Sequence, residues 1–226
     1  MKKYFSRLCG NKRAVSMIAP KIEKDIHSHA YIIEGPKGSG KHTLAREICK
    51  ALFCTGESSD TFPCEKCRFC RMTDEGINTD ICVLSREDRA TISVEATRGM
   101  LSTLNYAPDE GKYKVYIIDE ADRMTPPAQN ALLLSLEEPP SYVVFILATT
   151  EMHKLPTTIV SRCQRFDFRR IPSAEIAAHL TEIAQAESLT LDADAAMAIA
   201  RLARGGMRPV VPIYSTFLQR AYDSII

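Results

Sequence analysis

The chain has 226 residues, 45% of them hydrophobic and 25% charged, which is enough to bury the core of one large domain or of a large and a small one. With 29 Lys and Arg against 28 Asp and Glu, its net charge of +1 argues neither for nor against nucleic acid. No apolar run approaches the ~20 residues of a membrane helix, and no signal core follows the first lysines. We expect a reducing compartment, where the eight cysteines are metal ligands or buried thiols.

Short apolar segments alternate with helical patterns along most of the chain. The first 29 residues have a polar, helical pattern, and an apolar run at Ala30–Glu34 predicts a strand that ends in a glycine-rich loop. Apolar residues recur at helical spacing from Leu44 to Leu52, and a cysteine-rich insertion follows at about 53–75. Further strands are predicted at residues 80–85, 114–119 and 143–150. This alternation is typical of an α/β fold in which helices cover both faces of a parallel sheet.

The segment between the last two predicted strands carries helix signals at both ends. Thr125 is a candidate N-cap, and Pro126 is a candidate first helical residue. Pro139 and Pro140 should end this helix at about Glu137–Glu138, because a residue before proline avoids the α conformation.

The composition changes at Pro172. Two alanine-rich helical patterns follow it, SAEIAAHLTEIAQAESL and DADAAMAIARLARGG, and they predict a small, all-helical second domain. We therefore expect two domains, residues 1–172 with the cysteine-rich module inserted, and residues 173–226.

The stretch GPKGSGKHT matches a phosphate-binding loop at all but one position. Gly35, Gly40 and Lys41 fit the pattern G-x-x-x-x-G-K-[S/T], but the next position, which should carry a hydroxyl for magnesium, is His42. Thr43 has a hydroxyl one place late. Glycines let a backbone wrap closely around phosphate oxygens, which then meet the free N–H groups of a helix start. The alternative is a tight strand-to-helix turn with a chance lysine.

An acidic pair, Asp119 and Glu120, ends the apolar run KVYIID. In phosphate-loop ATPases a strand-end acidic pair holds magnesium and polarises the attacking water. The alternative is an exposed acidic turn, but the phosphate-loop pattern upstream favours the functional interpretation.

Four cysteines share the spacing C-x9-C-x2-C-x2-C, namely Cys54, Cys64, Cys67 and Cys70. Four thiolates this close in sequence can form a tetrahedral zinc site, which would be structural because no ligand position remains for a substrate. The alternatives are a redox pair or buried structural thiols. The other cysteines have no partner at metal spacing, and we expect ordinary buried or partly buried thiols at Cys9, Cys49, Cys82 and Cys163.

Two arginines lie in short motifs that say little by themselves. Arg162 belongs to SRCQRF, which alone favours a solvated basic cluster, and Arg208 belongs to GGMRP, which alone predicts only a helix end and a turn.

In their order along the chain these motifs resemble the bacterial clamp loader of DNA polymerase III, within the AAA+ ATPases. The resemblance covers about residues 5 to 210. It rests on GPKGSGKHT, the four-cysteine insertion, NYAPDEGKYKVYIIDEADRMT, QNALLLSLEEPP, FILATTE, LPTTIVSRCQRF and GGMR. It implies a five-stranded parallel sheet between helices, with a small zinc-binding insertion and a helical lid domain after it.

The resemblance also implies roles for single residues. Asp119 and Glu120 would be the magnesium and water-polarising pair, and Arg162 an arginine finger that enters the ATP site of a neighbouring subunit. Thr149 or Thr150 would sense the γ-phosphate, and Arg208 would be a second sensor on the lid. The implied nucleotide-binding residues are Gly35, Gly38, Gly40, Lys41, His42, Thr43, Asp119, Thr149 and Arg208.

Two departures from the family pattern matter. Magnesium prefers oxygen ligands, so His42 predicts weakened magnesium-dependent hydrolysis while ATP or ADP binding is retained. The δ′ type of subunit often has a degraded phosphate loop, and the chain resembles that type more than the γ/τ motor type. Family members also continue into an all-helical collar domain, which we expect to be absent from this chain.

The resemblance therefore predicts a cytoplasmic bacterial subunit of a hetero-oligomeric, pentameric ring that loads the sliding clamp onto primed DNA. Its partners would be the γ/τ and δ subunits, and its task would be to supply Arg162. One alternative is a full ATPase motor of the γ/τ type. Another is a zinc-stabilised module that binds nucleic acid or protein without nucleotide, although the near-neutral charge and the lack of a basic-aromatic stripe weaken it.

Overall fold

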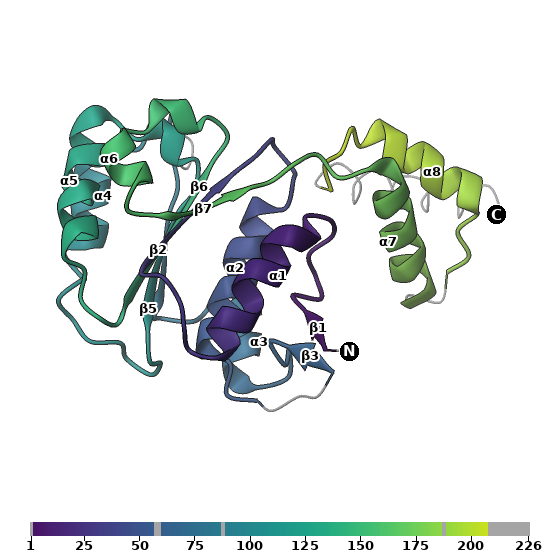
Figure 1. Cartoon of the computed structure of the whole chain (residues 1–226), viewed down its shortest axis with the longest axis horizontal. Helices are drawn as coiled ribbons and strands as arrows, with labels where there is room; N and C mark the ends of the chain where they lie inside the picture. Colours follow the sequence, from purple (N-terminus) through teal and green to yellow (C-terminus); the bar gives the residue numbers. More distant parts are fainter. Residues whose placement is uncertain (1, 57–59, 87–88, 187–188, 208–226) are drawn as a thin grey trace.

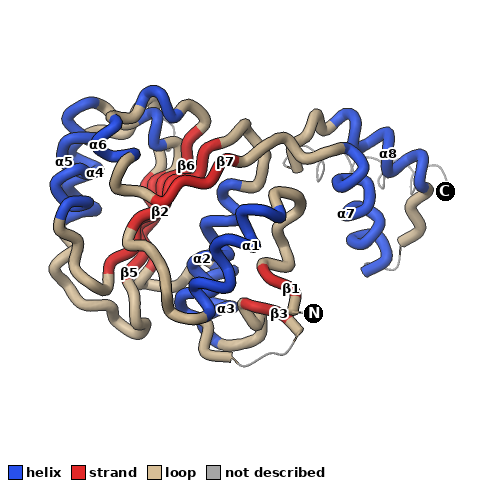
Figure 2. The backbone as a smooth tube through the Cα atoms, in the orientation of Figure 1, coloured by secondary structure: helices blue, strands red, loops and turns tan. Residues whose placement is uncertain are grey.

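The computed structural model describes residues 2–56, 60–86, 89–186 and 189–207. At its centre lies a parallel five-stranded sheet with the order β4-β5-β6-β2-β7 (Figures 1 and 2). The strands are β2 (Ala30–Glu34), β4 (Ile81–Leu84), β5 (Lys114–Ile118), β6 (Val143–Thr149) and β7 (Gln164–Asp167). The expected α/β fold with a parallel five-stranded sheet is confirmed.

Helices cover both faces of the sheet (Figure 1). One face is covered by α1 (Lys12–Glu23) and α2 (Lys41–Phe53), and short α3 (Arg68–Glu75) packs on α2. The other face is covered by α4 (Val94–Leu101), α5 (Pro126–Glu137) and α6 (Thr157–Val160). Within the described ranges, no helix has the length and apolar character that crossing a membrane requires.

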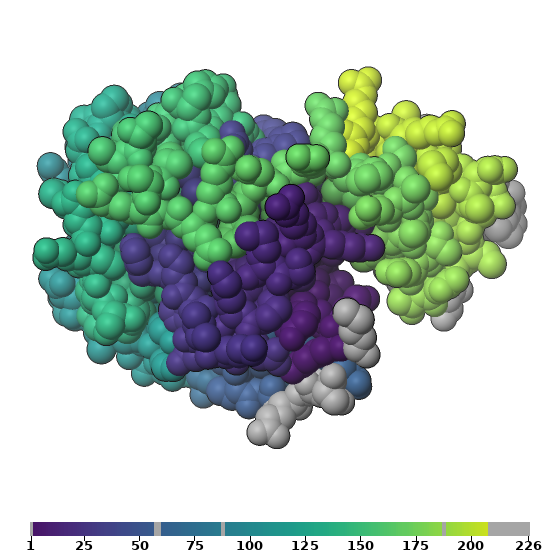
Figure 3. All heavy atoms as spheres, viewed as in Figure 1, coloured from purple at the N-terminus to yellow at the C-terminus, as the bar shows by residue number. Residues whose placement is uncertain are grey.

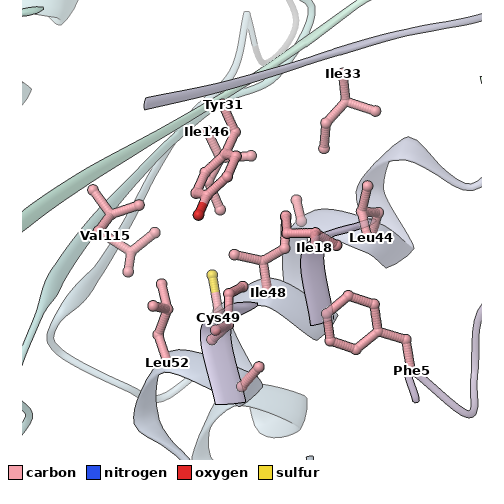
Figure 4. Packing of buried hydrophobic residues seen from close by; sticks show 14 of the residues in the cluster. Phe5, Ile18, Tyr31, Ile33, Leu44, Ile48, Cys49, Leu52, Val115 and Ile146 are labelled. Carbon is pink, nitrogen blue, oxygen red and sulfur yellow. The ribbon is translucent and has the colours of Figure 1, made fainter. Parts of the chain in front are cut away.

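The strands alternate their side chains between two cores. Tyr31 and Ile33 of β2 point toward α1 and α2, where they meet Leu44 and Ile48 (Figure 4). Their neighbour Ile32 lies in the core on the opposite face. Because a strand buried on both faces needs apolar residues at every position, these strands appear in the sequence as continuous apolar runs.

The helices α7 (Ser173–Ala186) and α8 (Ala193–Leu202) pack against each other on a third, smaller core (Figure 1). In Figure 3 the atoms of this part, green to yellow, gather at one side of the molecule. The chain then returns to the glycine loop, where the Met207 N–H donates to the Gly38 carbonyl over 3.0 Å. The first helix after Pro172 begins at Ser173, but the division into two domains stays a prediction.

Sequence patterns located most of the central elements, but they missed the short strands β1 (Lys3–Tyr4), β3 (Thr61–Phe62) and β7 and the short helices α3, α4 and α6. The helix after Thr125 begins at Pro126 and ends at Glu137, as expected, although the Thr125 side chain makes no capping hydrogen bond. The helical prediction for residues 1–29 is wrong before α1, because β1 pairs in parallel with β3 of the cysteine-rich insertion. The edge strand β7 was also missed; it lies inside the stretch interpreted as a basic cluster.

Candidate nucleotide and metal sites

The glycine loop joins β2 to α2, which is the strand-loop-helix context that a phosphate-binding loop requires. Gly40 caps α2 with a φ of 97°, a left-handed conformation that only glycine adopts at low cost. Gly38 also has a left-handed φ of 78°, and a Cβ there would lie only 3.1 Å from the Gly206 Cα, so a side chain at this position would be strained. The first turn of α2 therefore presents its free N–H groups beside a bare backbone cradle.

A cavity of about 380 Å³ opens at this loop, where the carboxyl ends of β5 and β6 meet the start of α2. Ligands bind open α/β sheets at this edge. Among the predicted site residues, the structure places around the cavity Gly38, Gly40, Lys41, His42, Thr43, Asp119, Glu120 and Thr149. The volume of the cavity and the arrangement of these residues fit a nucleotide phosphate tail. The roles of the individual residues stay predictions.

Lys41 lies folded back onto the loop. Its Nζ donates to the Gly35 carbonyl over 2.7 Å and to the Pro36 carbonyl over 2.9 Å. Burial lowers the pKa of Lys41, and the carboxylates of Asp119, Asp122 and Glu120 partly offset that effect. A cation held this way is available to an anion that enters the cradle.

His42 and Asp119 are in direct contact across the cavity. The His42 Nε2 lies 2.7 Å from the Asp119 Oδ2. Burial would raise the pKa of Asp119, but the hydrogen bond with His42 outweighs it together with the Glu120 N–H and the charge of Lys41, so that the pKa of Asp119 lies below its usual value. The imidazole thus occupies the place where the loop pattern has a magnesium-binding hydroxyl.

Glu120 is held by a residue that the sequence did not point to. It adopts a left-handed φ of 50°, and its carboxylate is paired with the Arg86 guanidinium. Arg86 follows β4, and β4 lies beside β5 with the Leu84 carbonyl bonded to the Asp119 N–H. Because parallel strands end at the same edge of a sheet, the sequence could have suggested that Arg86 lies near Glu120. The turn geometry that points the Arg86 side chain at Glu120 could not be predicted.

Asp122 fixes the end of β6. Its Oδ1 accepts the Thr149 hydroxyl over 2.7 Å and the Thr150 N–H over 3.0 Å. The Thr149 hydroxyl also accepts the Glu151 N–H over 3.1 Å and is fully buried. Of the two threonines proposed to sense a γ-phosphate, Thr149 is therefore occupied within the protein, whereas Thr150 is half-buried at the cavity.

The structure does not bring Arg162 to the cavity. It follows α6, and its side chain donates to the Thr158 carbonyl and to the Glu137 carboxylate, both over 2.8 Å. About a third of it is exposed. Arg162 does not line the cavity of its own chain. This position is the one expected of a residue that acts on the site of a neighbouring subunit. Arg208 lies outside the described residues.

The four cysteines of the insertion come together, as predicted. The Sγ atoms of Cys54, Cys64, Cys67 and Cys70 all lie within 4.8 Å of one another, and those of Cys64 and Cys70 are 4.0 Å apart. Two sulfurs of a tetrahedral zinc site with ~2.3 Å bonds are about 3.8 Å apart, so the cluster has the dimensions of a metal site. The remaining thiols are free and buried or half-buried, as expected for Cys9, Cys49, Cys82 and Cys163.

Hydrogen bonds in the cluster lower the pKa of the Cys54 and Cys67 thiols, while the hydrogen bond with Cys54 raises the pKa of Cys70. A bond with the Cys70 side chain, together with the Cys64 N–H that lies 3.3 Å from the Cys54 Sγ, lowers the pKa of Cys54 to about 5. Metal ions bind the deprotonated thiol, so this arrangement suits a metal ligand.

Buried charges tie the cysteine segment to α2. Lys50, fully buried on α2, lies 2.5 Å from the Glu47 carboxylate and 3.4 Å from that of Asp74 on α3. Arg7 pairs with the same Asp74 over 2.9 Å. The N-terminal segment, the helix α3 of the insertion and the helix behind the glycine loop therefore share one ionic network.

Comparison with known proteins identifies the family. A sequence model described as "DNA polymerase III, delta subunit" matches residues 10–172 of this chain. The chain belongs to this family of DNA polymerase III subunits. The resemblance to the clamp-loader branch of the AAA+ proteins is thereby confirmed.

The curated relatives carry gamma and tau names. The chain is 38% identical to DNA polymerase III subunit tau of Bacillus subtilis over 209 residues, which cover 92% of this chain and 37% of that protein. It is 35% identical to the tau subunit of Escherichia coli, covering 92% and 32%, and 36% identical to the gamma subunit of Buchnera aphidicola from Schizaphis graminum, covering 98% and 60%. The chain thus spans about a third to three fifths of these relatives' lengths. The delta description of the family and the gamma and tau names of the relatives together leave both the δ′ type and the γ/τ type open.

Solved structures share the fold. A gamma subunit-related protein of Thermotoga maritima matches with a TM-score of 0.54 and 22% identity, over 80% of this chain and 57% of that one. The RuvB Holliday junction branch migration motor of the same organism matches with a TM-score of 0.61 and 18% identity, over 93% and 62%. At these identities the likeness supports the AAA+ fold alone.

Proposed function

We propose that this chain is a subunit of a bacterial DNA polymerase III clamp loader, a cytoplasmic, hetero-oligomeric ring that places a sliding clamp on primed DNA. The family match and the bacterial gamma and tau relatives support this placement. Within the ring its partners are the γ/τ and δ subunits, and its role is that of the δ′ type, which docks partners and supplies a catalytic arginine to a neighbour.

The contact between His42 and Asp119 carries the proposal. Magnesium keeps near-octahedral oxygen coordination at 2.0–2.1 Å, and an imidazole 2.7 Å from the Asp119 carboxylate replaces one oxygen ligand with nitrogen. The residues present therefore do not fit a magnesium site of the usual kind. The cradle and Lys41 are intact, so the chain binds ATP or ADP and hydrolyses it weakly or not at all.

Arg162 supplies the catalytic contribution in trans. A cation placed against a transferring phosphate stabilises the charge of the transition state, an effect worth ~10³ to 10⁵ in rate when it is delivered to GTPases. Arg162 lies outside its own cavity and is partly exposed, with its guanidinium paired to Glu137. That pair lies at the surface, so exchanging it for a neighbour's phosphate costs little.

Substitution of Arg162 tests this role. In a complex reconstituted with motor subunits, Arg162→Ala should lower the ATPase rate by well over about tenfold while the complex still assembles. Arg68→Ala is a matched control, because Arg68 also forms an exposed ion pair, 2.9 Å from Glu110. An unchanged ATPase rate in the Arg162 variant would contradict the assignment of Arg162 as an arginine finger.

A motor role of the γ/τ type is the second candidate. The 38% identity to the tau subunit of Bacillus subtilis favours it, as does the presence of Lys41, Asp119 and Glu120 around one cavity. In that case the cavity itself would hydrolyse ATP with magnesium, and Lys41 would be needed for turnover.

We also propose zinc as the metal of the four-cysteine cluster. Four thiolates favour zinc among the common divalent ions, and the cluster offers no open position for a substrate. Zinc there would hold Cys54 at the end of α2 together with the start of α3, and so keep the insertion folded.

A further inference from the structure

We propose that the nucleotide cavity takes its nucleotide together with a divalent transition-metal ion of the Co²⁺ or Zn²⁺ class, held by His42 and Asp119, in preference to Mg²⁺. The inference rests on the proposed nucleotide site and adds the metal chemistry of that site. It starts from the misfit between the residues present and magnesium.

The geometry suits one shared ion. Two adjacent ligands, each 2.0–2.2 Å from a metal and at right angles, lie about 3.0 Å apart. The His42 Nε2 and the Asp119 Oδ2 are already 2.7 Å apart, so a small opening of this pair creates two neighbouring coordination positions. Both side chains line the cavity beside Lys41, whose partners in a bound nucleotide would be phosphate oxygens.

Both ligands stand on fixed backbone. His42 is the second residue of α2, directly behind the Gly40 cap. Asp119 directly follows β5, and its N–H is bonded to the Leu84 carbonyl at the end of the neighbouring strand. Ligands placed by a helix start and a strand end change position little when a metal enters, which favours a selective site.

The donor set decides the class of metal. Imidazole nitrogen suits Zn²⁺, Co²⁺ and Ni²⁺, whereas carboxylate, carbonyl and water oxygens suit Mg²⁺. Asp119 supplies one carboxylate, but Glu120 is held by Arg86, and among the described residues no further His or Cys joins this pair. The remaining positions are then left to phosphate oxygens and water. Such a mixed nitrogen and oxygen set binds borderline ions more strongly than magnesium.

Nucleotide affinity in different metals tests the proposal. The protein, with its cysteine cluster first filled with zinc, is titrated with ATP in Co²⁺, in Mg²⁺ and in EDTA, and the same titrations are made on His42→Thr. His179→Ala is the matched control, because His179 forms a histidine-carboxylate pair with Glu182 (3.3 Å) on α7, away from the cavity. His42 is half-exposed, so its replacement leaves the core intact.

The measured quantity is the ratio of ATP affinity in Co²⁺ to ATP affinity in Mg²⁺. We expect this ratio to be about tenfold or more higher in the wild type and in His179→Ala than in His42→Thr. Losing a metal ligand should weaken metal binding at least as much as losing an outer-shell partner of a ligand does. The visible absorption of bound Co²⁺ should change between wild type and His42→Thr. An equal Co²⁺ to Mg²⁺ preference in both would overturn the inference and leave the nucleotide site standing. No ATP binding under any condition would overturn both.

Discussion

His42 and Asp119 decide what the cavity can do with a metal ion. The imidazole takes the position of the hydroxyl that would share magnesium with Asp119, and the two side chains satisfy each other at 2.7 Å. The rest of the cavity keeps the groups that bind phosphate, with Lys41 poised on the loop carbonyls. In the function that we propose, nucleotide binding and hydrolysis are thus separated at a single residue, His42.

Restoring the hydroxyl tests that separation. In a reconstituted complex whose motor subunits are inactivated in their own phosphate loops, His42→Thr should raise magnesium-dependent ATP hydrolysis by about tenfold or more over the wild-type chain, because magnesium regains an oxygen ligand beside Asp119. Steady-state phosphate release measures it, with His179→Thr as the control for loss of a histidine elsewhere. If the rate stays at the wild-type level, the defect of this site lies in another residue.

For single residues, the sequence predicted which side chains line the cavity but not which side chains pair with them. The loop pattern and the strand-end acidic pair located Lys41, His42, Asp119 and Glu120. Arg86 and Asp122 were missed as partners, because their pairings depend on how turns aim side chains after β4 and β5. No spacing rule carries that information.

The elements around the cavity come from strong local signals. The strands β2, β5 and β6 are buried on both faces, so their apolar runs stand out from the rest of the chain. The edge strand β7 has only Phe166 buried, and its polar neighbours hid it among basic residues. The pairing of β1 with β3 joins segments about sixty residues apart, which no local pattern can show.

The zinc proposed for the four-cysteine cluster predicts how the insertion responds to loss of one ligand. Purified protein should contain about one zinc ion per chain, and Cys67→Ser should lose it, because three thiolates bind zinc far more weakly than four. We expect the Tm of that variant to fall by about 5 °C or more, since the ionic network that joins α2 to α3 loses its support.

Elemental analysis and thermal unfolding measure both effects. Cys82→Ser is the control, as Cys82 is a half-buried thiol of β4 outside the cluster. Full zinc content in Cys67→Ser would contradict the assignment of the cluster as the metal site.

In the whole molecule the two features concerned with ATP are kept apart. The cavity opens at the carboxyl edge of the sheet and is also lined by Met207 of the segment that follows α8, while Arg162 lies after α6 with its side chain on Glu137. The function that we propose puts the nucleotide in the cavity and the catalytic arginine elsewhere on the chain, an arrangement that suits a ring in which each subunit completes its neighbour's site.

One comparison tests this account most directly, namely the ATPase rate of the reconstituted complex with Lys41→Ala or with Arg162→Ala in this chain, in magnesium buffer. Gel filtration first confirms that both complexes assemble. We predict that Arg162→Ala lowers the rate by more than about tenfold and that Lys41→Ala changes it by less than about twofold, since only the arginine acts on a hydrolysing site. If Lys41→Ala instead lowers the rate as much as Arg162→Ala, the chain hydrolyses ATP itself and is a motor subunit.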